Sequence, residues 1–207
     1  MNTTLIYPPR TLADLISRPS DRIARIALDT SLVLGGATLT AVMAQVAVHL
    51  GFTPVPVTGQ TLAVLLTGTA LGWRRGALCQ LLYWALGMIM PVAWFAGGEH
   101  GWQAATGATA GYLVGFVVAA AVVGYLTEKR QDRSLSTSLP AMLAGSALIY
   151  LCGVLWLAHR LDLPVTGGTS NAVDLGLTPF LAGDLIKLLI AGVATPVAWK
   201  LAHRPVR

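Results

Sequence analysis

The segment from Thr178 to Lys200, TPFLAGDLIKLLIAGVATPVAWK, is apolar over almost its whole length and is long enough to cross a lipid bilayer as a helix. Two opposite charges, Asp184 and Lys187, interrupt it one helical turn apart. A charge in hydrocarbon costs about 3 kcal/mol on insertion scales, so such residues are retained mainly where they face a bundle interior or a wet cavity. The segment therefore predicts a membrane helix that borders a polar pocket holding a small solute.

The rest of the chain predicts an all-α integral membrane protein. Hydrophobic residues make up 55% of the 207 residues and charged residues only 11%, whereas soluble domains average about 25% charged residues. The apolar runs are continuous rather than alternating, which disfavours a transmembrane barrel. We expect a polar N-terminal segment at residues 1–25, within a single transmembrane domain covering residues 1–207. Six membrane helices are expected at about 26–50, 60–71, 77–90, 107–126, 139–159 and 178–200.

The basic residues indicate how these helices are oriented. Of the 14 lysines and arginines, all except Arg160 and Lys187 lie in the N-terminal segment, the connections 73–76 and 127–138, or the C-terminal tail. Cytoplasmic loops carry an excess of Lys and Arg, so both termini are expected in the cytoplasm, which requires an even number of crossings. The same distribution accounts for the net charge of +5 without a nucleic-acid partner.

The inner connections are short or charged, whereas the three outer connections are apolar and rich in Gly, Pro and aromatic residues. Long structured loops on one face of a rigid scaffold often carry the functional site, so the pocket is expected to open outward. Beside the charged pair, the candidate solute contacts are Gln60, Trp94, Gln103, Tyr112, Tyr150 and Trp156. For the aromatic residues, core packing or a place in the membrane-interface belt is the alternative.

Three interpretations of Asp184 and Lys187 compete. The two side chains can neutralise each other, form part of a proton or ion relay, or recognise a solute directly. Recognition is favoured, because a carboxylate accepts N–H donors and an ammonium donates to a carbonyl or attracts a carboxylate. No histidine or cysteine spacing predicts a metal site, and the chain contains neither GxxxxGK[ST], GxSxG nor HExxH. The sequence thus predicts a solute-binding protein without a cofactor, not an enzyme.

Small residues recur in the first helix, where Ala37 and Ala41 form a small-xxx-small pair. Such a pair places two small side chains on one helix face and lets another helix approach closely. That helix can belong to this chain or to a separate membrane subunit.

Four strings in this chain resemble the BioY family, the biotin-specific S components of energy-coupling factor (ECF) vitamin transporters. They are TPVPVTGQTLAVLLTGTALG (53–72), GYLVGF (111–116), YLCGVLWLA (150–158) and PFLAGDLIK (179–187). The resemblance implies six helices in a prokaryotic cell membrane and an outward pocket for biotin. It also implies coupling to a transmembrane T subunit and two ATPase subunits, which together deliver the vitamin inward.

The resemblance assigns roles to particular residues. The GDLIK string matches at Asp184 and Lys187, which implies that both contact biotin; Lys187 is expected to meet either the ureido oxygen or the valerate carboxylate. Ala37 and Ala41 are similar to the AxxxA element by which S components meet the T subunit. Ala108 and Ala110 stand where the family pattern has Pro and Gly, so contacts from that loop are not transferred. The 51–60 loop is expected to close over the pocket as a lid. The alternative function is a stand-alone proton-coupled or facilitative transporter.

Overall fold

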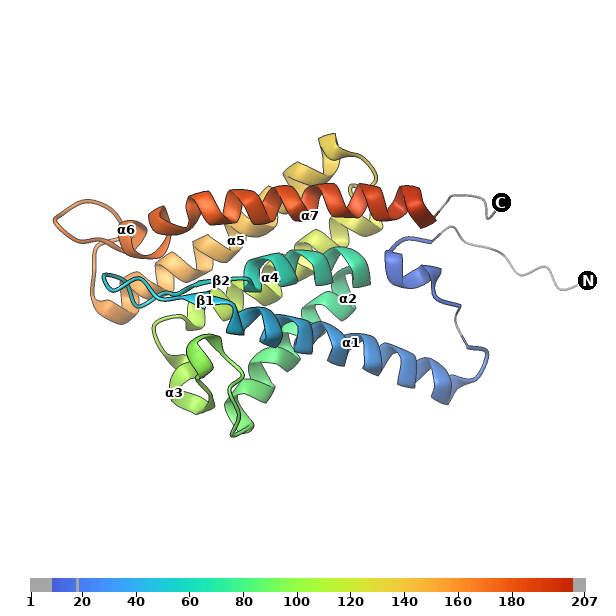
Figure 1. Ribbon diagram of the computed structural model, residues 1–207, viewed down its shortest axis with the longest axis horizontal. Coiled ribbons are helices and arrows are strands. Elements are labelled where there is room, and N and C mark those ends of the chain that lie inside the picture. The colour runs from blue at the N-terminus through green and yellow to red at the C-terminus, as the bar shows by residue number, and fades with distance from the viewer. Residues whose placement is uncertain (1–8, 18, 203–207) are drawn as a thin grey trace, which may run out of the picture.

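A computed structural model describes residues 9–17 and 19–202 as an elongated bundle of helices (Figure 1). The helix α1 begins and α7 ends at the same end of the bundle, which we call the terminal end; β1, β2, α3 and α6 lie at the opposite end, the loop end. In chain order the elements are η1 (Leu12–Leu15), α1 (Arg22–Gln45), β1 (Ala47–Val48), β2 (Val57–Thr58), α2 (Gln60–Ile89), η2 (Ala96–Gly98), α3 (Gly101–Thr106), α4 (Ala110–Glu128), α5 (Leu135–Leu161), α6 (Ala172–Gly176), η3 (Thr178–Phe180) and α7 (Leu181–Ala202).

The architecture confirms an all-α fold suited to a membrane. Within the described residues, four stretches are long and apolar enough to cross a bilayer, namely α1, α4, α5 and the stretch Ala172–Ala202 that contains α7. The described strands are the two-residue pair β1 and β2, joined antiparallel with Ala47 opposite Thr58 and Val48 opposite Val57. Residues 1–8 and 18 of the predicted polar N-terminal segment lie outside the described residues.

Several helix bounds differ from the predicted ones, most clearly at the first helix. Instead of 26–50, α1 covers Arg22–Gln45, because the Asp21 side chain accepts a hydrogen bond from the Ala24 backbone N–H at 2.9 Å and caps the helix early. The chain then leaves the helix to form β1. The helices predicted at 107–126 and 139–159 are α4 and α5, with bounds that differ by two to four residues at each end.

The helix α2 is a hairpin with two helical halves. Gly72 has φ 83° and ψ 177°, a conformation open to glycine alone, and there the chain turns back on itself. A Cβ placed on Gly76 would lie only 2.9 Å from the Gly68 Cα, which shows how closely the two halves pack. The predicted split into 60–71 and 77–90 therefore exists, but the turn is at Gly72. The basic residues Arg74 and Arg75 belong to the second half, not to a turn at 73–76.

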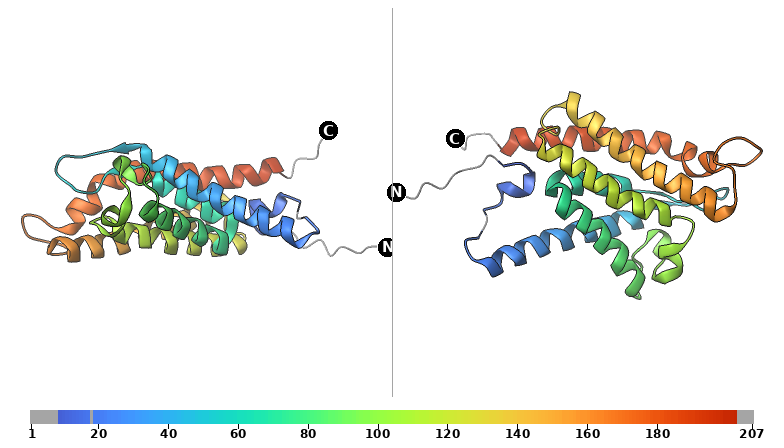
Figure 2. Two further views of the ribbon diagram at one scale, coloured as in Figure 1. Left: turned by 90° about the horizontal axis from the view of Figure 1, so that it is seen from below. Right: turned by 180° about the vertical axis from the view of Figure 1, so that it is seen from behind.

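Glycines on α4 set its distance from both neighbouring elements. A Cβ on Gly124 would lie 2.5 Å from the backbone of Gly72 and Trp73, and one on Gly115 would lie 2.8 Å from the Ile149 Cα of α5. Contacts of backbone against backbone at this range are possible only without a side chain, as is common between membrane helices. In this way α4 is held between the α2 hairpin and α5, with α1 on the outside of the hairpin (Figure 2).

The helix α1 packs through its small residues against α2, which corrects one interpretation. Ala37 and Ala41 are buried in the core of the chain, with 0% and 6% of their surface exposed. Between them, Thr40 accepts a hydrogen bond from the Gln80 side chain of α2 at 3.3 Å. The pair thus serves internal packing, and its side chains are not open to a partner subunit. The reason is that the smallest side chains of α1 face the hairpin that approaches it most closely.

A buried cluster joins three parts of the chain at the terminal end. The Trp199 indole N–H of α7 donates to the carboxylate of Asp132, and the Arg133 guanidinium lies over the Trp199 ring. Arg133 also donates to the backbone oxygen of Pro9 at 2.9 Å. Burial raises the pKa of Asp132, while the Trp199 hydrogen bond and the charge of Arg133 oppose that rise. The cluster therefore holds the α4–α5 connection against the end of α7.

Candidate functional site

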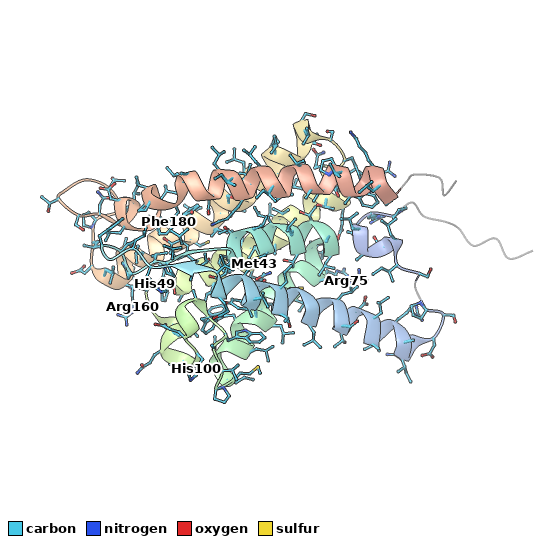
Figure 3. The ribbon with its side chains drawn as sticks, viewed as in Figure 1. Met43, His49, Arg75, His100, Arg160 and Phe180 are labelled. Atoms are coloured by element: carbon cyan, nitrogen blue, oxygen red, sulfur yellow. The ribbon has the colours of Figure 1, made fainter. Side chains whose placement is uncertain are left out.

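A cavity of about 460 Å³ lies at the loop end of the bundle, where Figure 3 labels two of its wall residues, His49 and Phe180. Small-molecule sites in proteins typically span about 300–1,000 Å³. The wall is formed by α2, α4, α5 and α7, together with the connections that precede α2 and α4. Its polar residues are His49, Thr58, Gln60, Thr61, Tyr83, Glu99, Gln103, Thr109, Tyr112, Tyr150, Asp184 and Lys187.

The start of α7 positions the charged pair. Asp184 lies in the first turn of α7, where the positive end of the helix dipole favours a carboxylate. Lys187 follows three residues later on the same face, and its Nζ lies 2.6 Å from the Asp184 Oδ1. Only 8% of the Asp184 surface is exposed. The two residues thus form an ion pair between a buried carboxylate and a half-buried ammonium, and both line the cavity.

Two further residues hold the Asp184 carboxylate from neighbouring helices. The Tyr150 hydroxyl of α5 donates to Oδ2 at 2.6 Å, and the Thr61 hydroxyl of α2 donates to Oδ1 at 3.3 Å. A carboxylate has about four lone-pair positions, so one position on Asp184 remains for a further donor. Lys187 has three N–H donors and gives one to Asp184. Mutual neutralisation and solute recognition are therefore compatible, because the paired groups keep unused hydrogen-bonding capacity beside an open space.

A second polar pair lines the cavity from α2 alone. The Gln60 side-chain amide donates to the Tyr83 hydroxyl at 2.8 Å and accepts from the Thr58 hydroxyl at 2.9 Å. Gln60 was predicted as a solute contact, whereas Thr61 and Tyr83 were missed. Gln60 and Tyr83 meet only because α2 folds back at Gly72. The hydrophobic periodicity of the sequence does not indicate that Gln60 and Tyr83 are in contact.

Three other predicted residues also lie in the wall. Gln103 comes from α3, while Tyr112 and Tyr150 come from α4 and α5. The two tyrosine rings pack edge to face with centroids 6.2 Å apart. The Tyr112 hydroxyl donates to the backbone oxygen of Gly176 at 2.7 Å, which fixes α6 against the bundle. These residues form the aromatic side of the cavity.

Trp94 and Trp156 are not part of the wall, so a direct solute contact by either tryptophan is not supported. The Trp94 indole N–H donates to the backbone oxygen of Tyr83 at 2.8 Å, and its ring stacks on Tyr83 with centroids 6.3 Å apart. The Trp156 indole N–H donates to the backbone oxygen of Gly107 at 2.9 Å. Each ring lies behind a wall residue or loop and supports it. The aromatic wall instead includes Phe116 and Phe180, which sequence reasoning missed.

The connection between α1 and α2 covers part of the cavity. Pro54, Val55 and Pro56 line it, and the Thr53 hydroxyl donates to the backbone oxygen of Leu175 at 2.6 Å. This hydrogen bond joins the connection between β1 and β2 to α6, which lies at the same end of the bundle. The described residues contain no group of three His, Cys, Asp or Glu side chains that could hold a metal ion.

The fold and the site together define a membrane-embedded helical bundle with a solute-sized polar cavity at one end. The crystal structure of the S-component for biotin from an ECF-type ABC transporter has the same fold, with a TM-score of 0.74 at 19% sequence identity. The match covers 88% of this chain and 95% of that one. The fold is that of an S component.

The family follows from the sequence comparisons. The BioY family model matches residues 17–204, and the chain belongs to that family. The biotin transporter BioY of Rhodobacter capsulatus is 37% identical over 173 residues, which cover 75% of this chain and 88% of that protein. The biotin transporter BioY of Thermotoga maritima is 37% identical over 156 residues, covering 75% and 86%. The resemblance drawn from the four sequence strings is confirmed, and the family is one of transporters, not enzymes.

Proposed function

We propose that this chain is the biotin-binding S component of an ECF transporter in a prokaryotic cell membrane. The observation that carries the proposal is the Asp184–Lys187 pair, which borders a solute-sized cavity in a chain of the BioY family. Biotin is the ligand named for the relatives, and it is a small molecule with hydrogen-bonding groups at both ends. The function requires no cofactor.

The chain is proposed to form one transmembrane domain with six crossings and cytoplasmic termini. The crossings are α1, the two halves of α2, α4, α5 and α7. Two observations support this orientation. The chain enters α1 and leaves α7 at the same end of the bundle (Figure 1). That terminal end also carries Arg74, Lys129 and Lys200, as the positive-inside rule requires of a cytoplasmic face.

The ureido group of biotin suits the charged pair. It presents two N–H donors on either side of a carbonyl oxygen. One N–H is proposed to fill the free position on Asp184, and the carbonyl is proposed to accept from Lys187. The bicyclic ring and its thioether then pack against Tyr112, Phe116 and Phe180, in keeping with the preference of sulfur for aromatic edges.

Capture is proposed to occur from outside, with the 51–60 loop acting as the lid. Thr53 and its hydrogen bond to Leu175 hold that loop over the cavity. Inward release is assigned to a T subunit and two ATPase subunits, because the chain contains no nucleotide-binding motif of its own. A proton relay, the alternative raised from the sequence, has no supporting contact. Within residues 19–202, the hydrogen bonds and ion pairs of Asp184 and Lys187 include no second carboxylate and no histidine.

Biotin binding by the purified protein tests the proposal. The detergent-solubilised chain is expected to bind biotin saturably, at one molecule per chain, in isothermal titration calorimetry. Lipoate is the matched control ligand, since it has a sulfur ring and a valerate tail but no ureido group, and it is expected not to compete. Absence of biotin binding by folded, monodisperse protein would overturn the assignment. Equal binding of lipoate would show that the ureido group is not recognised.

The outer face of α1 is the proposed contact with the T subunit, in place of the buried Ala37 and Ala41. Ala27, Ser31 and Gly35 follow one another at four-residue spacing and are all exposed. No atom lies within 4 Å of a Cβ placed on Gly35, so another helix can approach closely there. The approaching helix is proposed to belong to the T subunit of an ECF module, whether that module serves this chain alone or several S components.

Tryptophan at Gly35 is expected to disrupt assembly without affecting the cavity. In a membrane co-expressing the ECF module, Gly35→Trp is expected to weaken assembly with the T subunit by about 5- to 150-fold, since one misfitted contact costs about 1–3 kcal/mol. Biotin binding by the isolated variant is expected to be unchanged. Leu151→Trp, at an exposed position of α5, is the control for an added indole. Unchanged assembly of Gly35→Trp would exclude this face of α1.

A further inference from the structure

The polar residues of the cavity wall fall into two groups with different bonding states. The inner group is internally paired: Asp184 bonds to Lys187, Tyr150 and Thr61, and Gln60 bonds to Tyr83. The outer group consists of His49, Glu99 and Gln103. Among the described residues, no hydrogen bond or ion pair involves any of these three side chains.

The outer group marks the mouth of the cavity. His49, Glu99 and Gln103 are exposed although they line the cavity, whereas Asp184, Gln60 and Tyr83 are buried. The wall therefore has a paired polar region inside and an unpaired polar region at the opening. A ligand with polar groups at both ends meets both regions.

Local structure holds His49 at this opening. The residue directly follows β1, and Nε2 of its ring lies 2.9 Å from where a Cβ on Gly97 would be. Gly97 has φ 73°, a conformation that favours glycine. Because glycine has no side chain, the His49 imidazole packs directly against the Gly97 backbone. Gly97 in turn belongs to a loop closed by two hydrogen bonds. The backbone N–H groups of Trp94 and Phe95 both donate to the backbone oxygen of Glu99, at 3.1 and 2.9 Å.

The inner region is unsuitable for a carboxylate. Asp184 already supplies one negative charge there, and Lys187 neutralises it at 2.6 Å. A second carboxylate beside this pair would leave a net negative charge in a buried site, which is costly. The opening is solvated, and the outer group includes two side chains with N–H donors, His49 and Gln103.

We propose that His49 donates an imidazole N–H to the valerate carboxylate of biotin at the mouth of the cavity, while the ureido group occupies the Asp184–Lys187 region. Gln103 is the second donor. Glu99 is a like charge at the same opening and reduces the attraction. The inference rests on the proposed function and selects between the two positions that the sequence left open for the carboxylate. It makes His49 a specificity-determining residue for acids over their neutral derivatives.

Biotin and biotinamide, in which an uncharged amide replaces the carboxylate, separate this role from general binding. The wild-type protein is expected to prefer biotin over biotinamide by about tenfold, the low end for a hydrogen bond to a charged group. In His49→Ala that preference is expected to disappear, with the affinity for biotinamide unchanged. His49→Gln keeps an N–H donor and is expected to retain part of the preference. His100→Ala, which removes a nearby imidazole outside the cavity wall, is expected to behave as wild type.

Each other outcome overturns a defined statement. If His49→Ala weakens both ligands equally, the ring only packs against Gly97 and the proposal is wrong. If the preference persists in His49→Ala but disappears in Lys187→Ala, the carboxylate lies in the inner region. If the wild-type protein binds neither ligand, the proposed function itself fails, and this inference fails with it. Glu99→Gln is an independent test, because it removes the like charge from the opening. The affinity of this variant for biotin is expected to rise, and its affinity for biotinamide is expected to stay constant.

Discussion

Asp184→Asn is expected to weaken biotin binding by about 2–3 kcal/mol, which corresponds to about 30- to 150-fold in Kd. The carboxylate is the charged acceptor of the inner region and keeps one free position for a ureido N–H. Asparagine offers a single neutral acceptor oxygen, whereas Tyr150 and Thr61 donate to different oxygens of the Asp184 carboxylate. The substitution also leaves the half-buried Lys187 ammonium without its counter-charge, and an uncompensated charge in such a site is energetically costly. Calorimetric titration of the purified variant measures the effect.

Asp162→Asn is the matched control for the same chemical change. Asp162 is exposed at the end of α5, outside the cavity wall, and has φ 53°, a conformation that asparagine also adopts readily. Its biotin affinity is expected to equal that of the wild type. Size-exclusion profiles and thermal unfolding of both variants establish that they are folded. A folded Asp184→Asn protein with wild-type affinity would show that the charged pair is only structural.

The charged pair was predictable because its signal is local. Asp184 and Lys187 stand three residues apart in an otherwise apolar stretch, so helix geometry alone places them on one face. Their neighbours were not equally accessible. Tyr150 was a candidate because it is an aromatic residue in an apolar helix, but nothing in the sequence indicates that its hydroxyl meets Asp184.

Contacts that depend on the turn at Gly72 were missed for a related reason. The chain reverses there, which brings Tyr83 back to Gln60. The sequence placed a turn nearby, at 73–76, because Trp-Arg-Arg-Gly reads as a polar interruption. The φ of 83° at Gly72 is a property of the folded chain, and any of several glycines could supply it.

When a helix is apolar on all sides, its sequence does not show which face packs against the core and which faces a partner or lipid. The spacing of Ala37 and Ala41 left internal packing and a partner subunit both open, and the family resemblance implied the partner; both residues face the core. Spacing identifies which residues share a face but not what the face meets. In α1 the stripe containing Gly35 and the stripe containing Ala37 are both small, and only the packing of α2 distinguishes them.

Gly124→Ala is expected to cause a large loss of stability. The new Cβ would lie 2.5 Å from the Gly72 carbonyl carbon and the Trp73 nitrogen, and 2.7 Å from the Trp73 Cα. These are backbone atoms at a turn whose conformation glycine alone adopts, so they cannot move aside as a side chain does. The helix α4 must shift, at a cost of about 3 kcal/mol for overpacking. For a chain of this size that lowers Tm by about 6–12 °C in a thermal unfolding series in detergent.

Gly35→Ala makes the same substitution in α1 and is the control. No atom lies within 4 Å of the new Cβ, so only helix propensity changes, and alanine is favoured over glycine by about 1 kcal/mol. Its Tm is expected to equal or exceed that of the wild type, and the difference between the two variants isolates the contact with the α2 turn. Gly124 does not line the cavity, so the folded fraction of Gly124→Ala is expected to keep its biotin affinity. A wild-type Tm in Gly124→Ala would mean that α4 and the turn at Gly72 are not in backbone contact, and the packing that positions α2 against α4 would need another basis.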